Sequence, residues 1–222
     1  MNIKYLLLVL SPLVAFMLTA CSTAIKDADV GESPATEERQ VESVTYIYDH
    51  NSTGIYWTAY KHSAKVAVQG IMDSIVVNGA EDSESILELL TNTSFTVYSS
   101  SVNSKDPLRD EKIRKFFFGN MSNGDAISGE IMSVLGDESD GDGTLNLKIN
   151  DLEREVPFVY EVEGETVNIR CTLDFNNWSC TRSLAELHKA CDEKHTGEDG
   201  KSIFWPTIDV LIETTLKVKV SS

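Results

Sequence analysis

From about residue 44 onward, apolar and polar side chains alternate in short runs that are separated by clusters of Gly, Asn, Asp and Ser. A period of two places apolar side chains on one face of a strand, and the intervening clusters are typical of turns. The pattern predicts an all-β antiparallel fold. The expected strands cover residues 44–48, 55–61, 65–77, 94–102, 126–135, 143–151, 153–162, 166–174 and 207–220.

The alternation is clearest in three consecutive runs in the second half of the chain. Turn residues at Asn150-Asp151 and Glu163-Gly164 would join these runs as tight hairpins, because Asn, Asp and Gly tolerate the backbone of short turns. Alternate side chains of a strand point to the same face of the sheet. The positions expected to share the inner face are Leu145, Leu147 and Ile149, then Val156, Phe158 and Tyr160, and then Ile169, Cys171 and Leu173.

Three segments have helical character, and all three are short. The middle one, residues 107–118, has Asp106 as its N-cap, Pro107 in its first turn and Gly119 at its end. The other two cover residues 86–90 and 183–194. The expected fold is therefore all-β with short helical insertions.

The first residues of the chain have the features of an export signal. Lys4 precedes a mostly apolar run over residues 5–17, which is shorter than the roughly 20 residues that a membrane-spanning helix needs. The run ends in Leu18-Thr19-Ala20-Cys21, which reads as a lipobox. We expect cleavage after residue 20 and a lipid anchor on Cys21. Plain secretion with an unmodified Cys21 is the alternative.

Ser22 follows the cysteine in place of the Asp that retains lipoproteins in the inner membrane of enterobacteria. We therefore expect a bacterial outer-membrane location facing the periplasm. Residues 21–43 are rich in Glu, Asp, Ser, Thr and Ala and contain few large apolar side chains, a composition typical of a disordered tether. The folded domain should then occupy residues 44–222.

The formal net charge of the chain is −16. So acidic a protein repels phosphate backbones and anionic headgroups, because like charges raise the energy of association. Nucleic-acid binding and electrostatic docking onto a membrane are not expected.

Several short blocks follow one another in a fixed order between Ile55 and the end of the chain. They are Trp57-Thr58-Ala59-Tyr60-Lys61 leading to Gly70, Arg109-Asp110 with Phe116-Phe117-Phe118, the strand Gly143-x-Leu145-x-Leu147-x-Ile149, Val156-Pro157-Phe158, and Leu173-Asp174-Phe175. In this order and spacing they resemble the YceI-like polyisoprenoid-binding proteins, a family of exported lipocalin-like barrels. The chain departs from that pattern at Asn150, where Gly is common, and at Ile71, where an aromatic residue is common.

The resemblance implies an extended antiparallel barrel of about eight strands whose interior holds the apolar tail of an isoprenoid, such as a polyprenyl quinone or alcohol. Transport, storage or sequestration of that ligand would be the function, and a homodimer is possible in such a family. An eight-stranded barrel is just wide enough for one slender ligand or for a solidly packed interior. The candidate lining residues are Trp57, Phe95, Val97, Phe117, Leu147, Phe158, Tyr160, Ile169 and Leu173.

The alternative function is that of a structural or interaction lipoprotein. In that case the same apolar residues would fill a dry core, and the acidic surface or the region of Trp178 and Trp205 would meet a protein partner. An enzyme is not expected, because the chain lacks a G-x-S-x-G elbow, a phosphate-cradling glycine loop and an H-E-x-x-H motif. No cofactor is expected either.

Three cysteines remain once Cys21 is assigned to the lipid. Cys171 alternates with inward-facing residues and should be a small buried hydrophobe, while Cys180 and Cys191 lie near a short helix. We predict a Cys180–Cys191 disulfide, which an oxidising periplasm permits.

Two groups of residues have side chains that could bind a metal ion. His188, Cys191 and His195, with Cys180, could hold zinc, although the oxidising compartment favours the disulfide. The acidic loop 137–143 has oxygen ligands for calcium but lacks the bidentate Glu that completes such a loop, so a hairpin loop is expected. No metal is therefore predicted.

Overall fold

The computed structural model describes residues 43–91 and 93–221. The predicted signal peptide, Cys21 and nearly all of the tether lie outside these residues. The chain divides into two units, residues 1–39 and 40–222, and the description below concerns the second unit alone. In the described part, no helix is long and apolar enough to cross a membrane.

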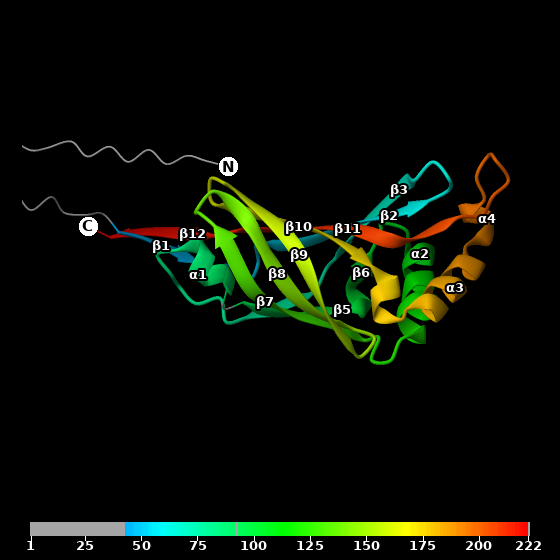
Figure 1. The fold of residues 1–222 in the computed structure, drawn as a ribbon, viewed down its shortest axis with the longest axis horizontal. Helices are drawn as coiled ribbons and strands as arrows, with labels where there is room; N and C mark the ends of the chain where they lie inside the picture. The colour runs from blue at the N-terminus through cyan, green and yellow to red at the C-terminus, as the bar shows by residue number, and fades with distance from the viewer. Residues whose placement is uncertain (1–42, 92, 222) are drawn as a thin grey trace, which may run out of the picture. The chain divides into compact units, whose positions relative to one another are not determined.

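Ten strands form one antiparallel sheet in the order β4-β5-β7-β8-β9-β10-β11-β2-β3-β6 (Figure 1). Alternating side chains give the sheet an apolar inner face, and the sheet curls around it. The strands are β2 (Thr53–Lys61), β3 (Val66–Met72), β4 (Ile75–Asn78), β5 (Ser94–Tyr98), β6 (Val102–Asn103), β7 (Ala126–Gly136), β8 (Asp140–Ile149), β9 (Leu152–Glu163), β10 (Thr166–Asp174) and β11 (Phe204–Thr215).

The two ends of this sheet meet, because β3 continues into β4 and β5 continues into β6. β3 pairs with β6 while β4 pairs with β5, so the sheet closes on itself. Across the bend at residues 73–74, Asp73 N donates to Ser101 O at 3.0 Å and Tyr98 N donates to Ser74 O at 3.3 Å. Counting β3 with β4 and β5 with β6 as single bent strands, the barrel has eight strands.

Local sequence explains the two-residue hairpin between β8 and β9. Asn150 and Asp151, between β8 and β9, have φ angles of 52° and 60°, as a type I′ turn requires. The Asn150 side chain also donates to Trp178 O at 2.8 Å and accepts from Ser122 N at 2.7 Å. Asn at this position therefore keeps the turn that a Gly would allow and ties it to two other segments.

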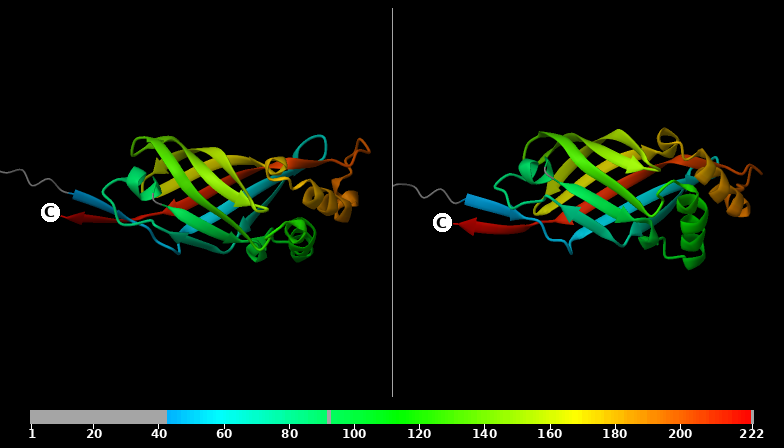
Figure 2. Two further views of the ribbon diagram at one scale, coloured as in Figure 1. Left: turned by 60° about the horizontal axis from the view of Figure 1, so that its bottom comes forward. Right: turned by 90° about the horizontal axis from the view of Figure 1, so that it is seen from below.

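The helices lie at the two ends of the barrel (Figures 1 and 2). At one end α1 (Ile86–Thr91) lies close to a separate ribbon, in which β1 (Ser43–Ile47) pairs with β12 (Lys217–Ser221). At the opposite end, named here the helical end, are α2 (Pro107–Lys112), η2 (Ile113–Phe117), η3 (Phe118–Asn120), α3 (Thr181–Ala190) and α4 (Asp192–His195). The short η1 (Ser99–Ser101) lies between β5 and β6, and η4 (Phe175–Trp178) lies between β10 and α3.

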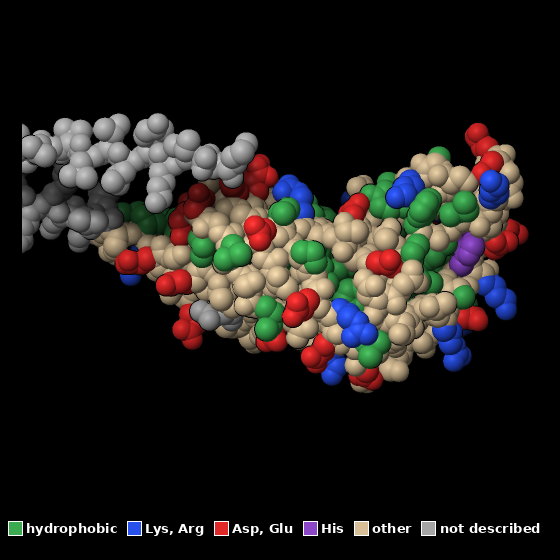
Figure 3. Space-filling model, viewed as in Figure 1, with side chains coloured by type: hydrophobic (Ala, Val, Ile, Leu, Met, Phe, Trp, Pro, Cys, Tyr) green, Lys and Arg blue, Asp and Glu red, His purple; other side chains and the backbone are tan. Residues whose placement is uncertain are grey.

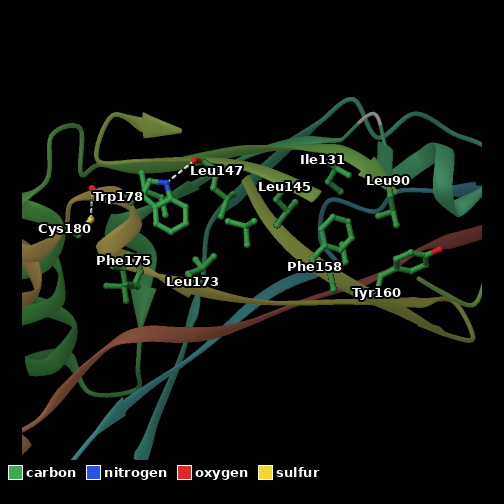
Figure 4. Close-up of a cluster of buried hydrophobic side chains, with 14 of the residues drawn as sticks. Leu90, Ile131, Leu145, Leu147, Phe158, Tyr160, Leu173, Phe175, Trp178 and Cys180 are labelled. Atoms are coloured by element: carbon green, nitrogen blue, oxygen red, sulfur yellow. Dashed lines mark hydrogen bonds between the residues drawn. The ribbon is translucent and has the colours of Figure 1, made fainter. Parts of the chain in front are cut away.

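The core has a packed part and a part that surrounds a cavity. Near α1 the interior is filled by Ile86, Leu90, Phe158, Tyr160 and Leu216, each at most 4% exposed. The Tyr160 hydroxyl donates to Asp137 O at 2.6 Å, which ties this ring to the loop between β7 and β8. Figure 4 shows Phe158 and Tyr160 beside Leu90 and Ile131, away from Trp178 and Phe175 near the helical end.

The predicted fold class is confirmed, and the deviations have local causes. The single strand expected over 65–77 bends at residues 73–74, and the one expected over 94–102 is interrupted by η1. The last strand is divided at Leu216, whose side chain is 1% exposed and whose N–H donates to Glu165 O at 2.8 Å. The helix expected over 107–118 is α2 followed by the π-helix η2, with Asp106 as the predicted N-cap.

Candidate functional site: an apolar cavity in the barrel

A cavity of about 190 Å³ lies inside the barrel between the packed end and the helical end. Its walls come from strands on all sides of the barrel and from η2 and α3, and they are almost entirely apolar. Figure 4 shows Leu145, Leu147 and Leu173 along the wall formed by β8 and β10. A barrel with such a space is not packed solid.

Six of the nine residues predicted from the sequence line this cavity. They are Trp57, Phe95, Val97, Phe117, Leu147 and Leu173. They come from β2, β5, η2, β8 and β10, so segments far apart in the chain meet around one space.

Phe158, Tyr160 and Ile169 do not line the cavity, contrary to the prediction. They do face the interior, since they are 2%, 2% and 5% exposed, but they lie toward the packed end. Tyr160 pairs with Ile169 across β9 and β10. Alternation along a strand shows which face of the sheet a residue occupies. It does not show at which position along the barrel axis side chains fill the interior.

Trp57 owes its position to the glycine opposite it. Trp57 on β2 pairs with Gly70 on β3, and a Cβ added to Gly70 would collide with Trp57 Cζ2. The indole Nε1 donates to Ile71 O at 3.3 Å. The absent side chain therefore lets the indole lie against β3, where it forms part of the cavity wall.

The cavity is long for its volume. Its lining extends along β2 from Ile55 to Lys61, a distance of about 20 Å for six steps along the strand at a rise of about 3.3 Å per residue. Pockets for compact drug-sized ligands commonly have roughly 300–1,000 Å³. A space of about 190 Å³ over this length suits one slender apolar chain better than a compact ring system.

The charged groups of the lining lie at the helical end. Lys61 at the end of β2 pairs with Phe204 of β11, and its Nζ donates to Lys194 O at 3.3 Å. Arg109 of α2 also lines the cavity and contacts Asp106 at 3.3 Å. Among the described residues that form the wall, none is Asp or Glu.

His195 is the other polar residue of note in this wall. It is 8% exposed, and its ring stacks on Phe204 with 5.0 Å between ring centroids. Its Nδ1 is buried and has no hydrogen-bond partner among the described residues. Burial, followed by the nearby His188 and Lys61, lowers the pKa of His195 to about 4, so the imidazole is neutral at pH 7.

The predicted Cys180–Cys191 disulfide is not present. All three cysteines of the described residues are free. Cys180 is the N-cap of α3 and Cys191 is its C-cap, so a ten-residue helix separates them. At about 1.5 Å per residue their Cα atoms lie about 16 Å apart, well beyond the roughly 7 Å that a disulfide allows. The sequence placed both cysteines near one helix but did not show that they lie at its opposite ends.

The zinc alternative needs Cys180 and Cys191 in one place, whereas they lie at opposite ends of α3. Burial raises the pKa of Cys171 and of Cys180 to about 11, and it also raises that of Cys191. Among the described residues, no group of three or more His, Cys, Asp or Glu side chains could hold a metal ion. Cys171 lines the cavity, in keeping with the inward orientation predicted for it.

The acidic loop 137–143 forms the connection between β7 and β8. The Asp137 carboxylate accepts hydrogen bonds from Ser139 N at 2.8 Å, Ser139 Oγ at 2.6 Å and Asp140 N at 3.3 Å. These bonds lower the pKa of Asp137. The carboxylate thus organises the turn, as expected for a hairpin loop.

Sequence reasoning missed one whole wall of the cavity. Ile208, Val210 and Ile212 of β11 line it and alternate along the strand, so their pattern could have found them. Arg109 and His195 carry no such signal, because they reach the cavity from helices whose position depends on tertiary packing.

The sequence matches no protein-family model and no curated protein. The structure of this chain is similar to several solved structures. A polyisoprenoid-binding domain from Saccharophagus degradans, described as implicated in plant cell wall breakdown, has a TM-score of 0.50 and 10% identity, covering 78% of this chain and 98% of that domain. BcnA from Burkholderia cenocepacia has a TM-score of 0.47 and 12% identity, covering 79% and 99%. The YCEI protein of Campylobacter jejuni has a TM-score of 0.45 and 14% identity, covering 73% and 90%.

The first of these similarities establishes the fold. Nearly the whole of the Saccharophagus domain is matched, so this chain shares the fold of that domain. The fold that the resemblance to YceI-like proteins implied is therefore confirmed.

Proposed function

We propose that this protein binds a slender amphiphile, of isoprenoid type or with a comparable apolar chain, inside the barrel, and that it acts as a binding protein and not as an enzyme. The observation that carries the proposal is the cavity, which is narrow, apolar and enclosed by residues from all sides of the barrel. Burial of an apolar chain there is favourable in proportion to the area removed from water.

Two further features support this function. The solved domain with the same fold is described as polyisoprenoid binding. In addition, the packed residues Phe158 and Tyr160 close the barrel toward α1. A chain would therefore enter from the helical end and keep its polar head there, near Lys61 and Arg109.

The interaction-module alternative fits the structure less well. It required a solidly packed barrel, whereas the interior contains a cavity of about 190 Å³. Trp178, one of the two residues suggested to meet a partner, is 1% exposed. Trp205 lines the cavity, and its indole N–H donates to His62 O at 2.9 Å.

Affinity is expected to rise with the length of the ligand's chain and then reach a plateau. Each additional buried CH2 contributes about 0.8 kcal/mol until the cavity is full. Titration of the purified protein with straight-chain alcohols of increasing length, followed by the fluorescence of Trp57 and Trp205 in the cavity wall, measures this dependence. Native mass spectrometry after mild lipid removal gives the stoichiometry.

The dependence of the affinity on salt distinguishes burial of a chain in the cavity from electrostatic adsorption on the surface. Burial of a neutral chain has no charge to screen, so the affinity for an alcohol should be the same at low and high ionic strength. A protein that carries no lipid on purification and binds no alcohol at micromolar concentration would contradict the proposal.

We further propose that the chain is an envelope lipoprotein anchored through Cys21 and facing the periplasm. The apolar run over residues 5–17 and the lipobox that follows it support this location. Cys21→Ser should leave the protein unprocessed or release it from the membrane fraction into the soluble fraction. Fractionation with immunodetection checks this outcome, and a Cys21→Ser protein that is processed and still sediments with membranes would exclude the lipid anchor.

A further inference from the structure

The charged side chains in the cavity wall are positive, whereas the protein as a whole has a negative net charge. The chain contains 35 Asp and Glu against 19 Lys and Arg. The described residues that line the cavity nevertheless include two basic side chains, those of Lys61 and Arg109, and no carboxylate. In Figure 3 the Lys and Arg side chains on the visible face lie mostly toward the helical end.

Both cations lie at the same end of the cavity as His195. Lys61 pairs with Phe204, and His195 stacks on Phe204. Lys112 of α2 donates to Ala190 O of α3 at 2.7 Å, so α2, which carries Arg109, lies against the end of α3 that is capped by Cys191. Three acids of these segments do not line the cavity. Asp106 contacts Arg109 at 3.3 Å, Asp192 lies 3.9 Å from His188, and the buried Asp110 accepts hydrogen bonds from Ser104 N and Oγ.

His195 adds an observation that is independent of charge. Its ring is more than nine-tenths buried in the cavity wall, and Nδ1 has no hydrogen-bond partner among the described residues. A buried polar atom without a partner destabilises a fold, so natural structures rarely keep one without a reason. A polar ligand atom at this end of the cavity would give it a partner.

We infer that the ligand is an acidic amphiphile, whose carboxylate or phosphate head contacts Lys61, Arg109 and His195 while its chain lies in the apolar cavity. This inference rests on the proposed function and narrows it to one class of head. A neutral imidazole can donate one hydrogen bond to the head, and the guanidinium of Arg109 keeps donors besides the one that contacts Asp106. Charge-assisted hydrogen bonds of this kind are stronger than neutral ones.

The test compares ligands with one chain and different heads. The probes are oleate with oleyl alcohol, and geranylgeranyl phosphate with geranylgeraniol, each titrated below its aggregation concentration and followed by tryptophan fluorescence. We expect each acid to bind about 10- to 100-fold more tightly than its alcohol. This preference should shrink as salt is added, because the charges are partly exposed to solvent. Preference for only one of the two acids identifies the head as carboxylate or phosphate.

Variants of Lys61 and Arg109 test whether these two side chains cause the preference for acids over alcohols. In the double variant Lys61→Gln/Arg109→Gln, the affinity for the acids should fall by about 10-fold or more, while that for the alcohols should fall much less, because a hydroxyl head carries no charge. Lys189→Gln is the matched control, because Lys189 is an exposed cation of the adjacent helix α3 that does not line the cavity. It should leave both affinities unchanged.

His195→Phe keeps an aromatic ring against Phe204 and removes the unpartnered nitrogen. We expect a higher urea midpoint of unfolding for the ligand-free protein, together with weaker binding of the acids. A residue with a purely structural role would not combine these two changes.

Three outcomes would overturn the inference. They are equal affinities for acid and alcohol in the unsubstituted protein, an equal loss of both in the double variant, and unchanged acid binding in His195→Phe. The first two leave the proposed function standing, since chains still bind. Failure of both the acids and the alcohols to bind would instead contradict the proposed function itself.

Discussion

Replacing Ala59 with Phe is expected to lower the affinity of the barrel for oleyl alcohol by about 100-fold. Ala59 lines the cavity from β2, between Ile208 of β11 and Val68 of β3. A phenyl ring there would occupy the path of the chain and exclude about four methylene groups. At about 0.8 kcal/mol each, the loss is about 3 kcal/mol, which corresponds to about 100-fold in affinity. Fluorescence titration measures it.

The adjacent residue provides the control. Thr58 lies on the opposite, outer face of β2, where it pairs with Gln69 of β3 and Asp209 of β11. Thr58→Phe adds the same ring outside the barrel and should leave the affinity unchanged. The cavity gives the Ala59→Phe ring space, so the barrel should still fold, and circular dichroism checks this. An Ala59→Phe protein that folds and binds as tightly as the original would place the ligand elsewhere.

The second large effect is expected on stability. Trp178→Ala should lower the free energy of unfolding by about 3–5 kcal/mol, the usual cost of truncating a buried aromatic side chain to Ala. Trp178 is 1% exposed and is among the largest fully buried side chains. Its Nε1 donates to Leu147 O at 3.1 Å, as Figure 4 shows. Urea unfolding followed by circular dichroism measures the change.

A conservative variant separates packing from hydrogen bonding. Trp178→Phe keeps most of the apolar volume but removes the indole N–H, so it should cost only about 1–2 kcal/mol. Because Leu147 lines the cavity, both variants should also loosen that wall and weaken chain binding, with Ala having the larger effect. A Trp178→Ala protein within about 1 kcal/mol of the original would show that this region relaxes around the lost side chain.

Much of the barrel could be predicted from the sequence because strand periodicity is a local property. The inward residues of β8 and β9 were identified from their spacing of two, and Leu145, Leu147, Ile149, Val156 and Phe158 are all at most 4% exposed. The Asn150-Asp151 turn could be predicted for the same reason, since both residues tolerate the positive φ angles that it requires.

The cysteines and the polar end of the cavity show where this reasoning stops. The sequence placed Cys180 and Cys191 near one helix, but a bond between them depends on a distance that only the position of α3 determines. Arg109 and His195 likewise approach the cavity from separate helices, and no spacing in the chain connects them. Side chains that meet through packing leave no periodic pattern.

By itself, the sequence determined the class of fold, the positions of most strands along the chain and the buried faces of β8, β9 and β10, because alternation and turn residues act over a few positions. Only the tertiary structure decided the order of the strands in the sheet and which part of the buried faces surrounds the cavity. Phe158 and Tyr160 fill the barrel where α1 and Leu216 meet them, whereas Leu147 and Leu173 face open space farther along. Both groups satisfy the same pattern, and what separates them is the volume that distant segments bring to each level of the barrel.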